Sequence, residues 1–345
     1  MRLVKAREGD FIETVEGLIF DVKGLVHPPD RIVAYLRYIE DPHGDRQRGN
    51  KTYIKVYSLS ERELMLRRRY PQYIYYDPVL GEHMQGVPNK QVSKIYRPSE
   101  KVSELLKKSS LDRVEMEAVE FVKLLHDSSN VKLENIGLSG SILVGLHMEN
   151  SDIDVIVYGR KNCSSIRNAL EQLMEEKNGL VSKYGLRDLE RLYRFRSKDT
   201  WMPLKEFIRM ERRKLMQGKF RGRDFFMRFL LDWDEVNEKY GDRTYIPSGY
   251  AKVKARVIED LDSIFTPCKY IIDDVKFLEG MKASPLKEIV SFRGRFCEQA
   301  KKGEMVIAQG KVEKVVEKDG KEYFRLILGA KPSDFMISQP HNGLM

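Results

Sequence analysis

The sequence predicts an α+β protein in which a central region of helices and strands lies between two β-rich modules. Three observations predict this order. Residues 1–98 contain short alternating or apolar segments separated by turn residues, which is typical of strands. Residues 99–240 combine such segments with helical periodicity. Residues 241–332 return to strand-like alternation, and residues 333–345 are expected to form a flexible tail.

Composition sets the class of protein before any motif is considered. The chain has 345 residues, of which 41% are hydrophobic and 33% charged, enough for two or three globular domains. No apolar segment approaches the length of a membrane span, and the first residues do not lead into a signal-peptide core, so we expect a cytoplasmic protein with no membrane partner. The net charge of +9 favours an acidic partner, with nucleic acid the first candidate.

Four strand-like segments, of which Phe11-Ile12 is the first, predict the first β-rich module, and a capping box at Ser60 to Glu63 predicts a helix that ends near Arg69. The other three segments are residues 17–22, 32–39 and 53–57. Four tyrosines follow three consecutive arginines. These tyrosines are either a surface that stacks on nucleic-acid bases or, more commonly for such residues, part of a core or interface. They are Tyr70, Tyr73, Tyr75 and Tyr76.

The central region alternates helices and strands. Apolar periodicity predicts a helix over residues 111–126, and a short apolar run predicts a buried strand over 133–138. After a Gly-Ser turn, a second strand is expected around Ile153 to Val157. Further helices are expected at residues 142–146, 164–177, 187–197 and 203–217, and a closing strand begins near residue 224. In the last module, Lys318 to Lys321 predicts a hairpin turn, and the strand count suggests a small barrel.

Two carboxylates stand one residue apart inside an apolar run. In a strand, alternate side chains share a face, so Asp152 and Asp154 project together while Ile153, Val155 and Val157 project to the other side. Two like charges this close repel each other, and a divalent cation with oxygen ligands is the usual compensation. The alternative is a solvated acidic turn after an ordinary strand and helix, but that leaves the acids inside Ile-Asp-Val-Ile-Val unexplained.

The Gly-Ser turn at Gly140 and Ser141 supplies a second element of chemistry. Glycine lets backbone N–H groups approach an anion, and the start of a helix favours phosphate. A phosphate-binding turn beside a carboxylate pair is suited to a nucleoside triphosphate and its metal ions.

Together these residues resemble the signature of the nucleotidyltransferase superfamily that includes DNA polymerase β. That signature is a hydrophobic strand, Gly-Ser, a short helix and Asp-x-Asp on the next strand, and Gly140, Ser141, Asp152 and Asp154 occupy its positions. The chain is similar to archaeal predicted nucleotidyltransferases of unassigned substrate. The resemblance covers about residues 110–235. It implies a nucleotidyltransferase palm, which is a mixed sheet with flanking helices, and two Mg²⁺ or Mn²⁺ ions.

The resemblance also implies a reaction and a third carboxylate. A nucleoside monophosphate would pass from a nucleoside triphosphate to an acceptor hydroxyl, with release of pyrophosphate. Asp224 opens an aromatic, strand-like run and is the first candidate for the third metal-binding and catalytic acid; Asp232 is the second. If Asp224 merely ends a loop, the chain is instead a degenerate palm that binds RNA or nucleotide without catalysis.

Clusters of basic residues are the candidate binding sites for an acidic partner. Arg209 to Lys214 and Lys219 to Arg223 precede the third acid, and Arg293 and Arg295 follow later. We expect Lys219 and Arg221 to bind the triphosphate, together with Gly140 and Ser141, and RNA to be the acceptor. A solvated helix face is the alternative for Arg209 to Lys214. No motif marks the selected base, the acceptor or the oligomeric state.

Overall fold

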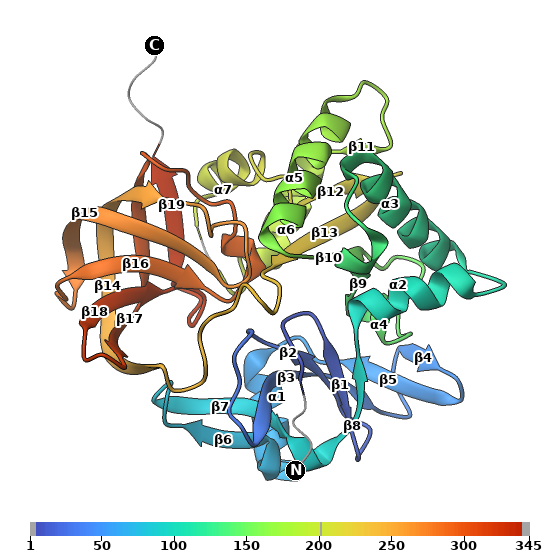
Figure 1. The fold of residues 1–345 in the computed structure, drawn as a ribbon, viewed down its shortest axis with the longest axis horizontal. Helices are drawn as coiled ribbons and strands as arrows, with labels where there is room; N and C mark the ends of the chain where they lie inside the picture. The colour runs from blue at the N-terminus through green and yellow to red at the C-terminus, as the bar shows by residue number, and fades with distance from the viewer. Residues whose placement is uncertain (1–4, 201, 340–345) are drawn as a thin grey trace. The chain divides into compact units, whose positions relative to one another are not determined.

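The computed structural model describes residues 5–200 and 202–339, and the chain forms two compact units (Figure 1). Unit 1 comprises Met1–Asp77, His83–Ser182 and Leu215–Tyr240. Unit 2 comprises Pro78–Glu82, Lys183–Lys214 and Gly241–Met345. Seven α-helices and three sheets in the described residues confirm the α+β class.

The N-terminal part of unit 1 is the predicted β-rich module. Its eight strands form one sheet with the path β4-β5-β3-β2-β1-β8, from which β7 pairs with β3 and β6 with β7. Alternation buries one side of each strand, as along β3, where Ile32, Ala34 and Leu36 are fully buried. The elements are β1 (Phe11–Thr14), β2 (Ile19–Val22), β3 (Arg31–Glu40), β4 (Arg46–Arg48), β5 (Lys51–Lys55), α1 (Leu59–Arg69), η1 (Pro71–Tyr73), β6 (Ile74–Asp77), β7 (Glu82–Pro88), η2 (Asn89–Gln91) and β8 (Val92–Tyr96).

The central sheet of unit 1 has the order β11-β12-β13-β10-β9. Strands β10 and β13 are parallel, and the other pairs are antiparallel, so the sheet is mixed as predicted. Its elements are α2 (Pro98–Lys107), α3 (Arg113–Ser129), η3 (Leu133–Asn135), β9 (Ile136–Leu138), α4 (Gly140–Leu143), β10 (Ile153–Tyr158), α5 (Arg160–Glu175), β11 (Val181–Ser182), β12 (Gln217–Phe220) and β13 (Arg223–Leu230).

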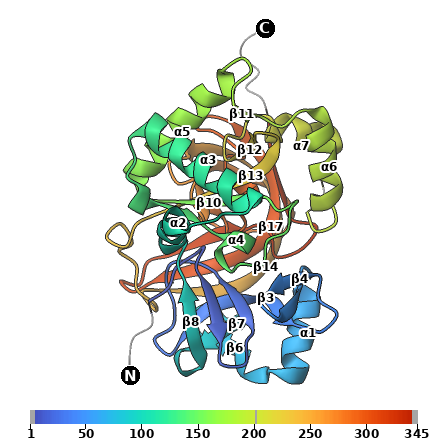
Figure 2. The same ribbon diagram turned by 90° about the vertical axis from the view of Figure 1, so that its right-hand side faces the viewer.

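The two faces of this sheet have different coverings. Helices α3 and α5 pack beside each other against β10 and β13 (Figure 2). On that face Phe121 of α3 contacts Phe220 and Phe225, with ring centroids 4.9 and 4.8 Å apart. Since neighbouring residues of a strand point to opposite faces, Asp154, Phe226 and Arg228 lie on the other face.

The N-terminal module packs on this second face, and the predicted boundary near residue 98 therefore does not separate two compact units. Phe11, Ile19, Tyr38 and Tyr53 form a single buried cluster with residues 143, 144 and 146, which follow the Gly-Ser turn. The Arg46 guanidinium donates to the carbonyl of Leu146 at 2.8 Å. The shared core brings together residues that are far apart in the chain, and no local sequence pattern indicates such contacts.

Unit 2 contains a closed ring of strands. The order β14-β15-β16-β18-β17 closes because β14 also pairs with β17, and β16 and β18 are parallel. The predicted hairpin turn at residues 318–321 joins β17 to β18. The elements are α6 (Leu186–Arg196), α7 (Leu204–Glu211), β14 (Arg243–Glu259), β15 (Cys268–Gly280), β16 (Leu286–Ser291), η4 (Gly294–Phe296), β17 (Met305–Glu317), β18 (Glu322–Ile327) and β19 (Phe335–Gln339).

Two expectations about this part of the chain need correction. Helices α6 and α7 were assigned to the central region, but they belong to unit 2, because Phe207 and Met210 of α7 form an apolar cluster that Ile337 of β19 joins. The expected tail is ordered through Gln339, since β19 pairs with β17 and Met336 is fully buried. Residues 340–345 lie outside the described part of the chain.

Two predicted helices are shorter than expected. The helix expected at residues 142–146 is α4, which spans only Gly140–Leu143, and Gly145 then takes a left-handed conformation (φ +67°). The helix expected at residues 203–217 ends at Glu211, because Gln217 is already paired with Phe226 in the central sheet.

A buried carboxyl group lies in the turn that leads into β1. Asp10 is 3% exposed and accepts a hydrogen bond from the backbone N–H of Arg7 at 3.0 Å. Burial raises the pKa of Asp10 to about 7, against the opposing effects of Arg7 and Arg97. The folded state therefore holds this proton more tightly than the unfolded chain does.

We predict that this carboxyl group makes unit 1 less stable as pH rises from about 4 to about 7. The stabilisation is fully present below the unfolded pKa of Asp10 and is lost as pH passes the folded pKa, and it amounts to roughly 2–4 kcal/mol. Asp10→Asn should flatten this part of the pH profile of the unfolding free energy, measured by denaturant titration. The exposed Asp45→Asn is the control. Identical slopes in Asp10→Asn and wild type would contradict the assignment.

Candidate functional site

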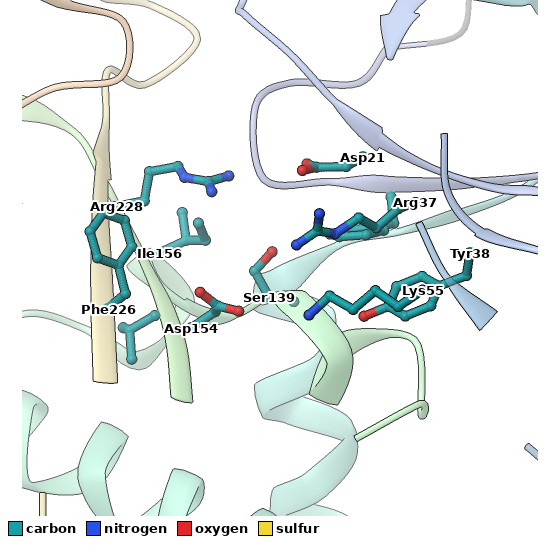
Figure 3. Close-up of a pocket in the computed structure, with 12 residues that line it drawn as sticks. Asp21, Arg37, Tyr38, Lys55, Ser139, Asp154, Ile156, Phe226 and Arg228 are labelled. Atoms are coloured by element: carbon teal, nitrogen blue, oxygen red, sulfur yellow. The ribbon is translucent and has the colours of Figure 1, made fainter. Parts of the chain in front are cut away.

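A pocket opens between the central sheet and the N-terminal sheet within unit 1. It encloses about 450 Å³, a volume that includes space open to solvent. Figure 3 shows charged side chains from both sheets pointing into it. The lining residues are Phe11, Asp21, Arg37, Tyr38, Lys55, Ser139, Gly140, Asp154, Val155, Ile156, Phe226 and Arg228.

The Asp-x-Asp carboxylates lie at the start of β10. Asp152 immediately precedes the strand and is exposed, and Asp154 is half-buried in the pocket. Within residues 5–200 and 202–339, neither carboxylate accepts a hydrogen bond or forms an ion pair. Burial and the neighbouring Asp152 raise the pKa of Asp154 to about 7, even though Arg228, Lys55 and Arg37 act in the opposite direction. The pair therefore lacks a compensating cation at contact distance.

Residue 140 must be a glycine, because the side chain of Asp154 leaves no space there for a Cβ atom. The backbone of Gly140 is left-handed (φ +60°), and a Cβ atom there would be 1.9 Å from Oδ2 of Asp154. The preceding residue fixes this approach, because the Ser139 N–H donates to the carbonyl of Asp154 at 2.8 Å. The Ser139 hydroxyl donates to the carbonyl of Gly9 at 2.7 Å, which ties the turn to the N-terminal module.

Ser141 is buried, and its hydroxyl has no hydrogen-bond partner in the described part of the chain. The helix in which it lies has only four residues, so a helix dipole adds little here. Phosphate binding by Gly140 and Ser141 stays a prediction.

The two candidates for the third acid lie at opposite ends of β13. Asp224 is one residue before Phe225, which pairs with Ile153, so Asp224 stands next to Asp152 on the neighbouring strand and on the same face. Its nearest cation is Lys219, at 3.7 Å. Asp232 lies eight positions further along the chain and pairs with Arg7 at 2.8 Å. The geometry favours Asp224 over Asp232.

The donor set fits a hard divalent cation at Asp152 and Asp154, since both offer carboxylate oxygens that bind nothing else. Asp224 does not complete a close three-ligand group with them in the described residues; the only such group there is Asp112, Glu115 and His147. That group already has other roles. Asp112 caps α3 in a capping box with Glu115, and Lys108 pairs with Glu115 at 2.6 Å.

Three pocket cations carry no sequence motif and were not anticipated. Arg37 comes from β3, Lys55 from the end of β5 and Arg228 from β13. Arg228 pairs with the buried Glu8 at 3.0 Å. Burial lowers the pKa of Lys55 to about 8, with Arg37 adding to the effect. A lysine or arginine in a polar position of an amphipathic strand is the only sequence signal, and it is shared by many surface residues.

Acidic groups behind the pocket are already neutralised. Lys23 pairs with Asp21 at 2.8 Å and with Glu8 at 3.1 Å. Burial alone would raise the pKa of Asp21, but Lys23, Arg228 and Arg37 outweigh it and hold that pKa below its usual value. Of the carboxylates that line the pocket, that of Asp154 has no contact partner among the described residues.

The structure places the predicted triphosphate-binding residues Lys219 and Arg221 outside the pocket lining. Lys219 lies opposite Asp224 in the β12–β13 hairpin, and Arg221 forms an ion pair with Glu120 at 2.7 Å. The third basic residue of this cluster, Arg223, is bonded to Glu117. These basic side chains thus form ion pairs with acidic residues of unit 1.

The other basic clusters lie in unit 2 and are engaged there as well. Arg213 pairs with Glu304 at 2.7 Å, and the buried Lys214 pairs with Glu211 at 2.7 Å. Arg293 and Arg295 both contact Asp199. Exposed ion pairs contribute little to stability, but they reduce the positive field that a polynucleotide would meet.

The fold and pocket define an α+β protein with a carboxylate pair facing cations from a second sheet. No protein-family model matches the chain, and no solved structure matches it. The chain is 32% identical over 341 residues to a protein of Methanocaldococcus jannaschii named uncharacterized protein MJ1086, covering 96% of this chain and 98% of that one. The chain belongs to the family of this archaeal protein.

None of the described helices combines the length and the apolar character needed to cross a bilayer.

We predict that Gly140→Ala is more destabilising than an equivalent change at a glycine with open space around it. Gly222 is the matched control, because it is also left-handed (φ +87°) and a Cβ there meets nothing within 4 Å. Gly222→Ala should cost about 1 kcal/mol for the backbone conformation alone. Gly140→Ala should cost at least about 1 kcal/mol more, because the Asp154 carboxylate must move.

A double-mutant cycle tests whether the contact with Asp154 causes this extra cost. In an Asp154→Ala background, the difference in unfolding free energy between Gly140→Ala and Gly222→Ala should shrink in denaturant titrations, because only the Cβ atom of residue 154, at 3.1 Å, is left to contact the new side chain. An equal cost of the two glycine changes in the wild-type background would show that the close contact is absent.

Proposed function

We propose that the protein is a metal-dependent nucleotidyltransferase that moves a nucleoside monophosphate from a nucleoside triphosphate to an acceptor hydroxyl, with RNA as the expected acceptor. The observation that carries the proposal is the arrangement of unpaired charges in one pocket. Asp154 has a carboxylate without a contact partner among the described residues, Asp152 lies two positions before it, and Arg37 and Lys55 line the same pocket as Asp154. Such a site suits a divalent cation bound to a polyphosphate.

The chain's own residues have defined parts in this reaction. Asp152 and Asp154 would hold Mg²⁺ or Mn²⁺, with Asp224 joining them once it leaves Lys219. The metal ions supply charge neutralisation on the triphosphate and a lower pKa for the acceptor hydroxyl. Gly140 keeps Asp154 in place, and the cations opposite hold the phosphates. The acceptor oxygen bonds to the α-phosphorus, the bond to the pyrophosphate oxygen breaks, and the acceptor proton passes to solvent.

A second candidate is a non-catalytic palm that binds RNA or nucleotide. The ion pair of Asp224 with Lys219 at 3.7 Å favours it, because the third acid is then engaged with a cation of the chain itself. The deciding experiment incubates the protein with each α-labelled nucleoside triphosphate, Mg²⁺ or Mn²⁺ and total RNA. It follows both pyrophosphate release and the labelled product. Binding without label transfer under any condition supports the second candidate.

We predict that Asp152→Asn and Asp154→Asn each lower the transfer rate at least about a hundredfold, an increase of roughly 2.7 kcal/mol in the barrier, because each removes a charged metal ligand. Asp112→Asn is the matched control. It removes a carboxylate from the other three-ligand group, while asparagine still caps the helix. Retained activity in both Asp152→Asn and Asp154→Asn would eliminate the carboxylate pair as the metal site.

The two candidates for the third acid give opposite expectations. Asp224→Asn should lower the transfer rate at least about tenfold, because the residue lies beside Asp152. Asp232→Asn should keep nearly full activity and lose about 1 kcal/mol of stability with the Arg7 ion pair. Single-turnover rates and thermal unfolding of both variants measure the difference. The reverse pattern would assign the role to Asp232.

A further inference from the structure

We propose that the N-terminal β-rich module forms half of the nucleotide-binding site: Arg37 and Lys55 bind the triphosphate, and Tyr57 stacks against its base. The inference rests on the proposed function and extends it, because these three residues lie outside the region that carries the nucleotidyltransferase signature. It also assigns a task to a module that no motif explains.

The two cations are held on adjacent strands. Tyr38 pairs with Lys55 in the β3–β5 ladder, so Arg37, the preceding residue, lies beside the end of β5. Both side chains are half-buried and line the pocket. Figure 3 shows both of them extending from the N-terminal sheet toward Ser139 and Asp154. Their positive charges therefore face Asp154 across the pocket.

Neither cation has an anionic partner in the chain as described. Arg37 and Lys55 donate no side-chain hydrogen bond and make no ion pair within 4.0 Å in residues 5–200 and 202–339. Other basic residues around the pocket are engaged, Arg228 with Glu8 and Lys23 with Asp21. Leaving a half-buried cation unpaired is unfavourable unless an anion occupies the site at some stage.

The charge pattern identifies the anion as a metal-bound polyphosphate. A simple monovalent anion would have to bind near two carboxylates that repel it. A polyphosphate carries enough charge to contact both cations and, through a divalent cation, both carboxylates. Arg37 offers a planar fork of donors and Lys55 a point charge, and both are common phosphate ligands.

Tyr57 follows Lys55 by two residues and is 55% exposed. Its ring centroid is 5.1 Å from Nζ of Lys55 and 5.5 Å from the guanidinium carbon of Arg37. An exposed aromatic ring beside phosphate-binding cations is how many proteins bind a nucleobase, since the ring stacks on any base. Tyr57 would then contribute to affinity without selecting strongly among bases.

Equilibrium binding tests the proposal without relying on turnover. The probes are a nucleoside triphosphate analogue with a methylene group in place of the α,β-bridging oxygen, and inorganic tripolyphosphate, both with Mg²⁺ at low salt. The variants are Arg37→Ala/Lys55→Ala, Tyr57→Leu and Tyr57→Phe. Lys51→Ala is the matched control, because this lysine lies on the same strand but pairs with Glu40 at 2.6 Å. Thermal unfolding of each variant checks that the fold is kept.

The expected results separate phosphate binding from base binding. Arg37→Ala/Lys55→Ala should weaken the binding of both probes at least about tenfold. Tyr57→Leu should weaken only the nucleotide analogue, about fivefold to tenfold, and Tyr57→Phe should restore it because the ring is kept. Lys51→Ala should bind both probes like the wild type.

The failures are distinguishable. Unchanged binding of both probes by the double variant, with a wild type that binds them, would overturn the phosphate role and leave the proposed function in place. An equal loss of both probes in Tyr57→Leu would overturn the stacking role. If the wild type binds no nucleotide analogue with Mg²⁺ or Mn²⁺, the proposed function itself fails.

Discussion

The contact between Gly140 and Asp154 is the constraint on which the pocket depends. The turn after β9 passes so close to the carboxylate that no side chain fits at residue 140. Backbone hydrogen bonding from Ser139 to Asp154 holds the turn against β10, and the Ser139 hydroxyl holds it against the N-terminal module. The same few residues thus position the carboxylate, shape the pocket floor and join two sheets.

Local sequence patterns were sufficient to predict several helices, strands and turns of this protein. The apolar stripe of α3, the buried run of β10 and the hairpin between β17 and β18 were all predicted near their observed positions, because periodicity and turn chemistry act over a few residues. The mixed order of the central sheet agrees with the prediction as well. The placement of α6 and α7 was wrong, since it depends on a long-range contact between Met210 and the strand that contains Ile337.

The sequence is also a poor guide to which charged residues are available to bind a ligand. The basic runs at 209–214 and 219–223 are conspicuous in the sequence, yet residues such as Arg213 and Arg221 form ion pairs with Glu304 and Glu120. Arg37 and Lys55 are single charges in ordinary strands, and among the described residues they make no ion pair although they line the pocket beside Asp154. Whether a charge is available depends on its neighbours in space, and a charge cluster in the sequence does not reveal them.

The buried cluster that joins Phe11, Tyr38 and Tyr53 to Leu143 has a consequence for how this protein can change over evolutionary time. An excised central sheet would expose the apolar side chains that now cover the Gly-Ser turn. The two segments must therefore be inherited as one piece, and neither can be exchanged among proteins as an independent module. An insertion is tolerated more easily at an exposed loop tip, such as the one around Gly49, where the backbone has space on all sides.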